Sequence, residues 1–117
     1  MNIREVQYIT IPVSNLEASE RFYHEVFDLP IITLDDGSLG AQLNKHFIKF
    51  RKVDKVESPI VFGFVDKDSM ENIHSHLRNY YVDIVAGPTP TNELRRKASS
   101  ITVLDPDKNQ IEITVFE

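Results

Sequence analysis

The stretch DPDKNQIEITVF, from Asp105 to Phe116, is typical of a tight turn that runs directly into a β-strand. Asp, Pro and Asn favour such turns because proline fixes φ and the Asp and Asn side chains hydrogen-bond the backbone. Lys108 stands at a turn position that glycine often takes, so we expect Asn109 to adopt the left-handed conformation. The strand that follows, near 110–116, carries a single carboxylate, Glu112, among β-forming residues.

The first half of the chain predicts a strand, a helix and three further strands. Residues 3–13 are rich in β-forming residues and alternate from Val6 to Val13 in the manner of a half-buried strand. Ser14 and Glu17 stand three residues apart, as in a capping box, so we expect a helix that begins at Ser14 and is ended by Pro30. Turn residues then separate three extended stretches, near 31–35, 39–43 and 46–53.

The second half repeats this order of elements. Residues 59–65 predict a strand in which Val65 matches Val13, and Asp68 and Glu71 repeat the capping geometry at the start of a helix. Further strands are expected near 82–86, 98–104 and 110–116. Segment 87–97, GPTPTNELRRK, predicts the one long loop, and such loops often border a binding site.

The repeated order indicates an internal duplication within one domain of 117 residues. We expect unit 1 over about 1–54 and unit 2 over about 55–117, with a linker near 52–58.

Composition excludes several classes of protein. A net charge of −5 argues against a nucleic-acid partner, whose phosphates require clustered Lys and Arg, and it suits a cationic small ligand. No apolar run has the length of about 20 residues that a membrane span needs, so no membrane partner is expected. The chain has no cysteine, which excludes thiolate metal sites and fits a cytoplasmic location.

Three segments carry a resemblance to the vicinal oxygen chelate superfamily of glyoxalases, bleomycin-resistance proteins, fosfomycin-resistance enzymes and dioxygenases. They are YITIPVSNLEASERFY at 8–23, GP at 87–88 and DPDKNQIEI at 105–113. The resemblance implies an α+β fold in which two βαβββ units form curved mixed sheets around a cleft. It also implies a homodimer and a small-molecule ligand.

Metal-using members of that superfamily hold a divalent ion with four side chains, usually His and Glu. The resemblance places those positions at Tyr8, Lys49, Ile60 and Glu112. Only Glu112 keeps the family residue, since isoleucine has no donor atom and an ammonium group repels a cation. We therefore expect no metal or other cofactor, with a divalent metal as the alternative.

The resemblance also predicts which residues line the ligand-binding cleft, although it assigns no catalytic residue. They are Tyr8, Lys49, Arg51, Ile60, Phe62 and Glu112. Our hypothesis is that Lys49 and Glu112 form an ion pair to which Tyr8 adds hydrogen bonds. The alternative is that Lys49 extends into solvent and Glu112 is a surface residue.

Three functions are compatible with these residues. The first is a metal-free protein that binds a small aromatic or cationic molecule between Tyr and Phe side chains such as Tyr8, Phe62 and Phe64. The second is a metal-dependent lyase, isomerase or dioxygenase. The third is a non-catalytic interaction domain, which would need an exposed apolar patch.

Overall fold

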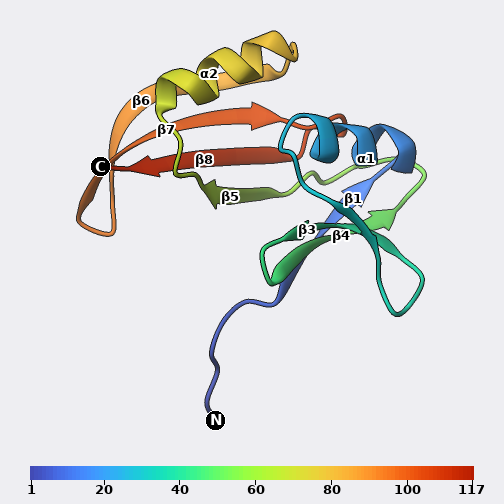
Figure 1. Cartoon of the computed structure of the whole chain (residues 1–117). Coiled ribbons are helices and arrows are strands. Elements are labelled where there is room, and N and C mark those ends of the chain that lie inside the picture. The colour runs from blue at the N-terminus through green and yellow to red at the C-terminus, as the bar shows by residue number, and fades with distance from the viewer. The chain divides into compact units, whose positions relative to one another are not determined.

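The computed structural model describes residues 1–117, which form two compact units, Met1–Ser58 and Pro59–Glu117. Each unit contains a strand, a helix and three further strands, and Figure 1 labels most of these elements along the chain. The predicted α+β fold with two βαβββ units is therefore confirmed. The division falls at the end of the expected linker.

Unit 1 is a four-stranded mixed sheet with one helix. Its sheet has the order β1-β4-β3-β2, in which β1 and β4 are parallel and the other neighbours are antiparallel. Its elements are β1 (Tyr8–Val13), α1 (Leu16–Glu25), β2 (Ile31–Thr33), β3 (Leu39–Leu43) and β4 (His46–Lys52).

Helix α1 begins one residue later than the capping pattern predicted. Asn15, and not Ser14, is the N-cap, and its side chain accepts a hydrogen bond from the Ala18 N–H at 3.1 Å. Asn is at least as good a cap as Ser, because its short side chain reaches the same free N–H group. The helix ends before Pro30, and Asp28 beyond it has a left-handed φ of 56°.

The core of unit 1 lies between α1 and one face of its sheet. Tyr23 of α1 is fully buried, and its ring lies 5.6 Å from that of Phe50 in β4. Ile11 of β1 is the register partner of Phe50, and it is buried as well. Because side chains alternate along a strand, the residues directly before and after Ile11 and Phe50 in their strands face the opposite side of the sheet.

Unit 2 has the same topology, with the sheet order β5-β8-β7-β6. Ile73 and Leu77 of its helix are buried, as are Ile111 and Ile113 of the central strand β8. Its elements are β5 (Val61–Val65), α2 (Met70–Asn79), β6 (Asp83–Glu93), β7 (Arg96–Leu104) and β8 (Gln110–Phe116). Neither α1 nor α2 is long and apolar enough to cross a membrane.

The second capping prediction was also displaced by one residue. Ser69 is the N-cap of α2, and its side chain accepts a hydrogen bond from the Asn72 N–H at 3.1 Å. The Asp68 carboxylate supports this cap from outside the helix, where it accepts hydrogen bonds from the Ser69 N–H and the Asn72 side chain.

Segment 87–97 is not a loop, which corrects the sequence prediction. It forms the outer part of a hairpin in which β6 and β7 pair as far as Glu93 and Arg96. Leu94 and Arg95 make the two-residue turn with φ of 49° and 64°, as in a type I′ hairpin turn. The prolines of this segment are tolerated because β6 is an edge strand with one unpaired side.

The turn at 105–109 is held by two side chains. The Asp105 carboxylate accepts hydrogen bonds from the N–H groups of Asp107 and Asn109, each at 2.9 Å, and from the Asn109 side chain. Asn109 is fully buried and also accepts from the Ile60 N–H at 3.0 Å. Lys108, and not Asn109, therefore takes the left-handed position, with φ of 66°.

Candidate functional site

The face of the unit 1 sheet opposite α1 gathers three of the residues predicted to bind a ligand. Strand register places Tyr8, Thr10 and Pro12 of β1 beside Phe47, Lys49 and Arg51 of β4, respectively. Gln42 and Gly40 of β3 lie on the other side of Phe47 and Lys49. These eight residues are called the helix-free face of unit 1.

An aromatic pair marks one end of this face. The rings of Tyr8 and Phe47 are stacked, with centroids 4.9 Å apart and planes at 7° to each other. Tyr8 is 46% exposed. A flat aromatic surface that remains open to solvent is suited to stacking against a ring of a ligand.

Lys49 lies next along β4 and is held by a residue that the sequence analysis did not select. Its Nζ lies 2.6 Å from Oδ2 of Asp36, in the turn between β2 and β3. The other oxygen of Asp36 accepts hydrogen bonds from the N–H and the hydroxyl of Ser38, at 3.0 and 2.5 Å. The Lys49 side chain is 29% exposed and that of Asp36 is 54% exposed.

This pairing shifts the pKa of both groups. The hydrogen bond from Lys49, with those from Ser38, holds the pKa of Asp36 well below its usual value. The hydrogen bond to Asp36 raises the pKa of Lys49, partial burial lowers it by less, and the negative charge of Asp36 adds to the increase. Lys49 therefore stays a cation at any physiological pH.

Arg51 is the second cation of the helix-free face of unit 1. It lies two residues beyond Lys49 on the same side of β4, its side chain is exposed, and it makes no ion pair. Its neighbour across the strands is Pro12, which carries no charge. The aromatic pair is therefore followed along β4 by one paired and one unpaired cation.

Glu112 lies on the corresponding face of unit 2. In register it stands between Gly63 of β5 and Thr102 of β7, and it is exposed. Its carboxylate makes no hydrogen bond or ion pair, whereas Lys49 is bound to Asp36 in unit 1. The hypothesis of a Lys49–Glu112 ion pair would join the two units and stays a prediction.

Strand register places Ile60 and Phe62 differently from Glu112. Phe62 pairs with the buried Ile111, and its ring contacts Phe64 at 5.4 Å, so it lies on the face that packs in the core. Ile60 lies just outside β5, where its carbonyl accepts a hydrogen bond from the Gln110 N–H. Neither side chain is on the strand face that carries Glu112.

The residue equivalent to Tyr8 is Val61. Tyr8 pairs with the residue two positions before Lys49, and Val61 pairs with the residue two positions before Glu112. The match of Val65 to Val13 was therefore displaced by one residue, and such a displacement moves every side chain to the other face.

The four positions implied for metal ligands do not fit a divalent ion. They hold a phenol, an ammonium already bound to Asp36, an alkyl side chain and the single carboxylate of Glu112. Nowhere in the chain do three or more His, Cys, Asp or Glu side chains form a group that could hold a metal. Oxygen- and nitrogen-rich ligand sets are what such ions require.

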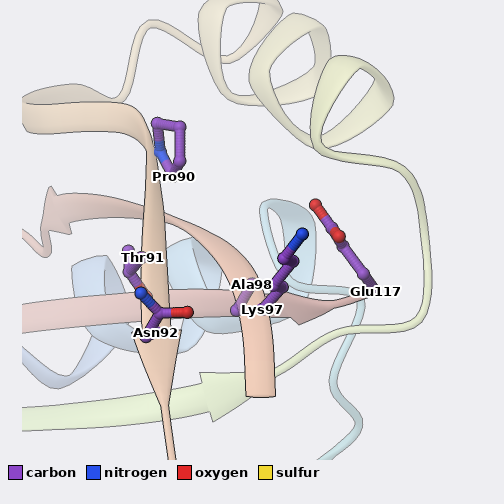
Figure 2. A pocket seen from close by; sticks show the side chains of 6 residues that line it. All are labelled: Pro90, Thr91, Asn92, Lys97, Ala98 and Glu117. Carbon is purple, nitrogen blue, oxygen red and sulfur yellow. The ribbon is translucent and has the colours of Figure 1, made fainter. Parts of the chain in front are cut away.

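A separate hollow of about 320 Å³ lies at the outer end of unit 2. Figure 2 shows that it is lined by Pro90, Thr91, Asn92, Lys97, Ala98 and Glu117. Asn92 and Lys97 are register partners in the β6–β7 hairpin, and the Glu117 N–H donates to the Lys97 carbonyl at 3.0 Å. The side chains of Asn92, Lys97 and Glu117 are exposed.

Comparisons with known proteins agree with this arrangement. The model of the Glyoxalase/Bleomycin resistance protein/Dioxygenase superfamily matches residues 5–113. Virulence protein STM3117 of Salmonella typhimurium is 26% identical over 125 residues, which cover 99% of this chain and 87% of that protein.

Solved structures show the same fold. The crystal structure of the Salmonella protein has a TM-score of 0.89 at 22% identity and covers all of both chains. The fosfomycin resistance protein FosX of Mesorhizobium loti has a TM-score of 0.74 at 16% identity, with 97% of this chain and 93% of that chain covered.

Proposed function

The chain belongs to the Glyoxalase/Bleomycin resistance protein/Dioxygenase superfamily, and on that premise we propose that it binds a small aromatic molecule on the helix-free face of unit 1. We also propose that the chain binds this molecule without the divalent metal that catalytic members of the superfamily use. The proposal rests on one observation, the stack of the exposed Tyr8 on the half-buried Phe47 beside the cations of β4. Aromatic side chains with a few placed polar groups are the usual lining of small-molecule sites.

The proposal is tested by titrating 2-naphthamide into the protein while backbone amides are followed by NMR. We expect saturable shifts centred on β1 and β4. Tyr8→Ala should weaken binding by about three- to tenfold, because stacking contributes about 0.5–1.5 kcal/mol. Tyr80→Ala is the matched control, since Tyr80 is equally exposed, at 47%, but lies at the end of α2.

Two results would contradict this location. One is the absence of saturable binding. The other is binding that survives Tyr8→Ala and is lost in Lys97→Gln, which would place the ligand in the hollow of unit 2.

Metal analysis of the purified protein tests the metal-free part. We expect less than stoichiometric transition metal and an unchanged melting temperature after EDTA treatment, because a bound ion stabilises the native state. A stoichiometric metal that is lost in Glu112→Gln would instead favour a metal-dependent lyase, isomerase or dioxygenase.

A further inference from the structure

We propose that the ligand of the helix-free face of unit 1 is an aromatic anion whose carboxylate or phosphate replaces Asp36 at Lys49 and is shared with Arg51. This inference rests on the proposed function and adds the charge of the ligand. It also assigns Asp36 the part of a competitor that occupies the cation while no ligand is bound.

Along one side of β4, an aromatic side chain is followed by two cations. Phe47, Lys49 and Arg51 are separated by two residues each, so they project from the same side of the strand. Successive members of such a row are about 6.6 Å apart along the strand. A ring stacked on the Tyr8–Phe47 pair therefore directs a substituent on its near edge toward the Lys49 ammonium.

The residues around Lys49 and Arg51 neutralise only part of their positive charge. The register partners of Lys49 and Arg51 are Thr10, Gly40 and Pro12, and none of them is charged. Asp36 is the carboxylate that contacts the row, and it neutralises one of the two cations. The face therefore keeps a surplus positive charge, although the chain as a whole carries −5.

The contact between Asp36 and Lys49 can be exchanged for a contact between Lys49 and a ligand anion. Both side chains are partly exposed, and exposed ion pairs contribute little net stability. Asp36 also has alternative partners, since Ser38 donates two hydrogen bonds to its other oxygen. A ligand anion can therefore take over Lys49 while the β2–β3 turn keeps its own hydrogen bonds.

The test compares three probes of the same shape, namely 2-naphthoate, 2-naphthamide and 2-naphthylmethylamine, in the NMR titration described above. We expect 2-naphthoate to bind tightest, and Lys49→Gln and Arg51→Gln each to weaken it by about fivefold with little effect on 2-naphthamide. The preference for 2-naphthoate should fall as salt rises, because ions screen exposed charges.

Asp36→Asn gives the sharpest result. If Asp36 competes for Lys49, its loss should tighten 2-naphthoate binding by about threefold or more and leave 2-naphthamide unchanged. Asp35→Asn is the matched control, because it removes a neighbouring charge that makes no contact with Lys49. The amide spectrum of each variant shows whether the sheet has kept its fold.

The outcomes separate the two proposals. Tyr8-dependent binding of 2-naphthamide with no preference for 2-naphthoate, or tighter binding of the amine, overturns the inference and leaves the proposed function intact. An Asp36→Asn variant that is folded but binds 2-naphthoate more weakly also overturns it. If none of the probes binds through Tyr8, the proposed function itself fails.

Discussion

Asp36 gives the stability of unit 1 a small dependence on pH, because its ion pair with Lys49 is partly exposed. Its carboxylate is more acidic in the folded protein than in the unfolded chain, because Lys49 and Ser38 donate hydrogen bonds to the ionised form. A group of this kind stabilises the fold above its unfolded pKa of about 3.9, and that contribution is lost as pH falls through the folded pKa.

We therefore predict that Asp36→Asn lowers stability at pH 7 and that the difference from the native sequence shrinks below about pH 4. Urea midpoints at pH 3, 5 and 7 measure this, with Asp35→Asn as the control. A stability difference of the same size at all three pH values would show that the ionised carboxylate does not contribute.

Asn109 is a fully buried polar residue of unit 2. It links the turn after β7 to the start of β5 through Asp105 and Ile60. We predict that Asn109→Ala destabilises the protein by about 2–3 kcal/mol, because the Ile60 N–H and Asp105 lose a buried partner. Denaturant unfolding measures the loss, and Asn79→Ala on the exposed end of α2 should change stability by less than about 0.5 kcal/mol.

At the scale of elements, the sequence predicted the helices and most strands, because their apolar residues recur with clear periods. The caps were displaced by one residue, since Ser14 and Asn15, like Asp68 and Ser69, are adjacent residues that can both cap a helix. Segment 87–97 was mistaken for a loop because proline and threonine are found in turns as well as in edge strands.

The candidate site was predictable only in part, for a geometric reason. Tyr8, Lys49 and Arg51 share a face because alternation along β1 and β4 is regular. Ile60 was matched to Tyr8 through an alignment of Val65 with Val13 that was off by one residue, which inverts the faces of β5, and Phe62 lies on the same face as Ile60. Asp36 was missed because no sequence pattern records that a turn residue reaches a side chain on another strand.

The turn of the β6–β7 hairpin contains strain that can be removed. Leu94 and Arg95 both have positive φ, a conformation that Asn and Gly adopt far more readily. We predict that replacing the pair by Asn-Gly raises stability by about 1–2 kcal/mol, as measured by thermal and urea unfolding. Leu94→Ala keeps the strained backbone and should not stabilise, so an equal gain in that variant would attribute the effect to the exposed leucine instead.

For the molecule as a whole, the net charge and the local charge of the helix-free face of unit 1 favour different ligands. The chain carries a net charge of −5, which suits a cationic compound, whereas Lys49 and Arg51 lie on one face of β4, which suits an anion. A ligand responds to the local potential of the surface it touches, and that potential depends on arrangement rather than on the sum.

The N-terminal segment leaves two apolar side chains exposed to solvent, although Glu5 between them contacts Lys45 and His46. Residues 1–6, which the sequence analysis placed partly in a strand, pair with no strand, and Figure 1 shows them leading away from β1. Ile3 and Val6 in this segment are 81% and 70% exposed. Such residues favour β-structure and cost free energy when they are left in water, so we expect a second copy of the chain to cover them.

We predict a homodimer with a molar mass of about 27 kDa, twice the 13.5 kDa of one chain, in light scattering at micromolar concentration. The double variant Ile3→Ser and Val6→Ser should shift the protein toward the monomer by about tenfold or more in dissociation constant, because it removes the apolar area that association would bury. Tyr81→Ser is the control, since Tyr81 is 92% exposed but lies after α2 in unit 2. A native protein that scatters as a monomer would contradict the dimer, and a double variant that remains dimeric would exclude this segment from the interface.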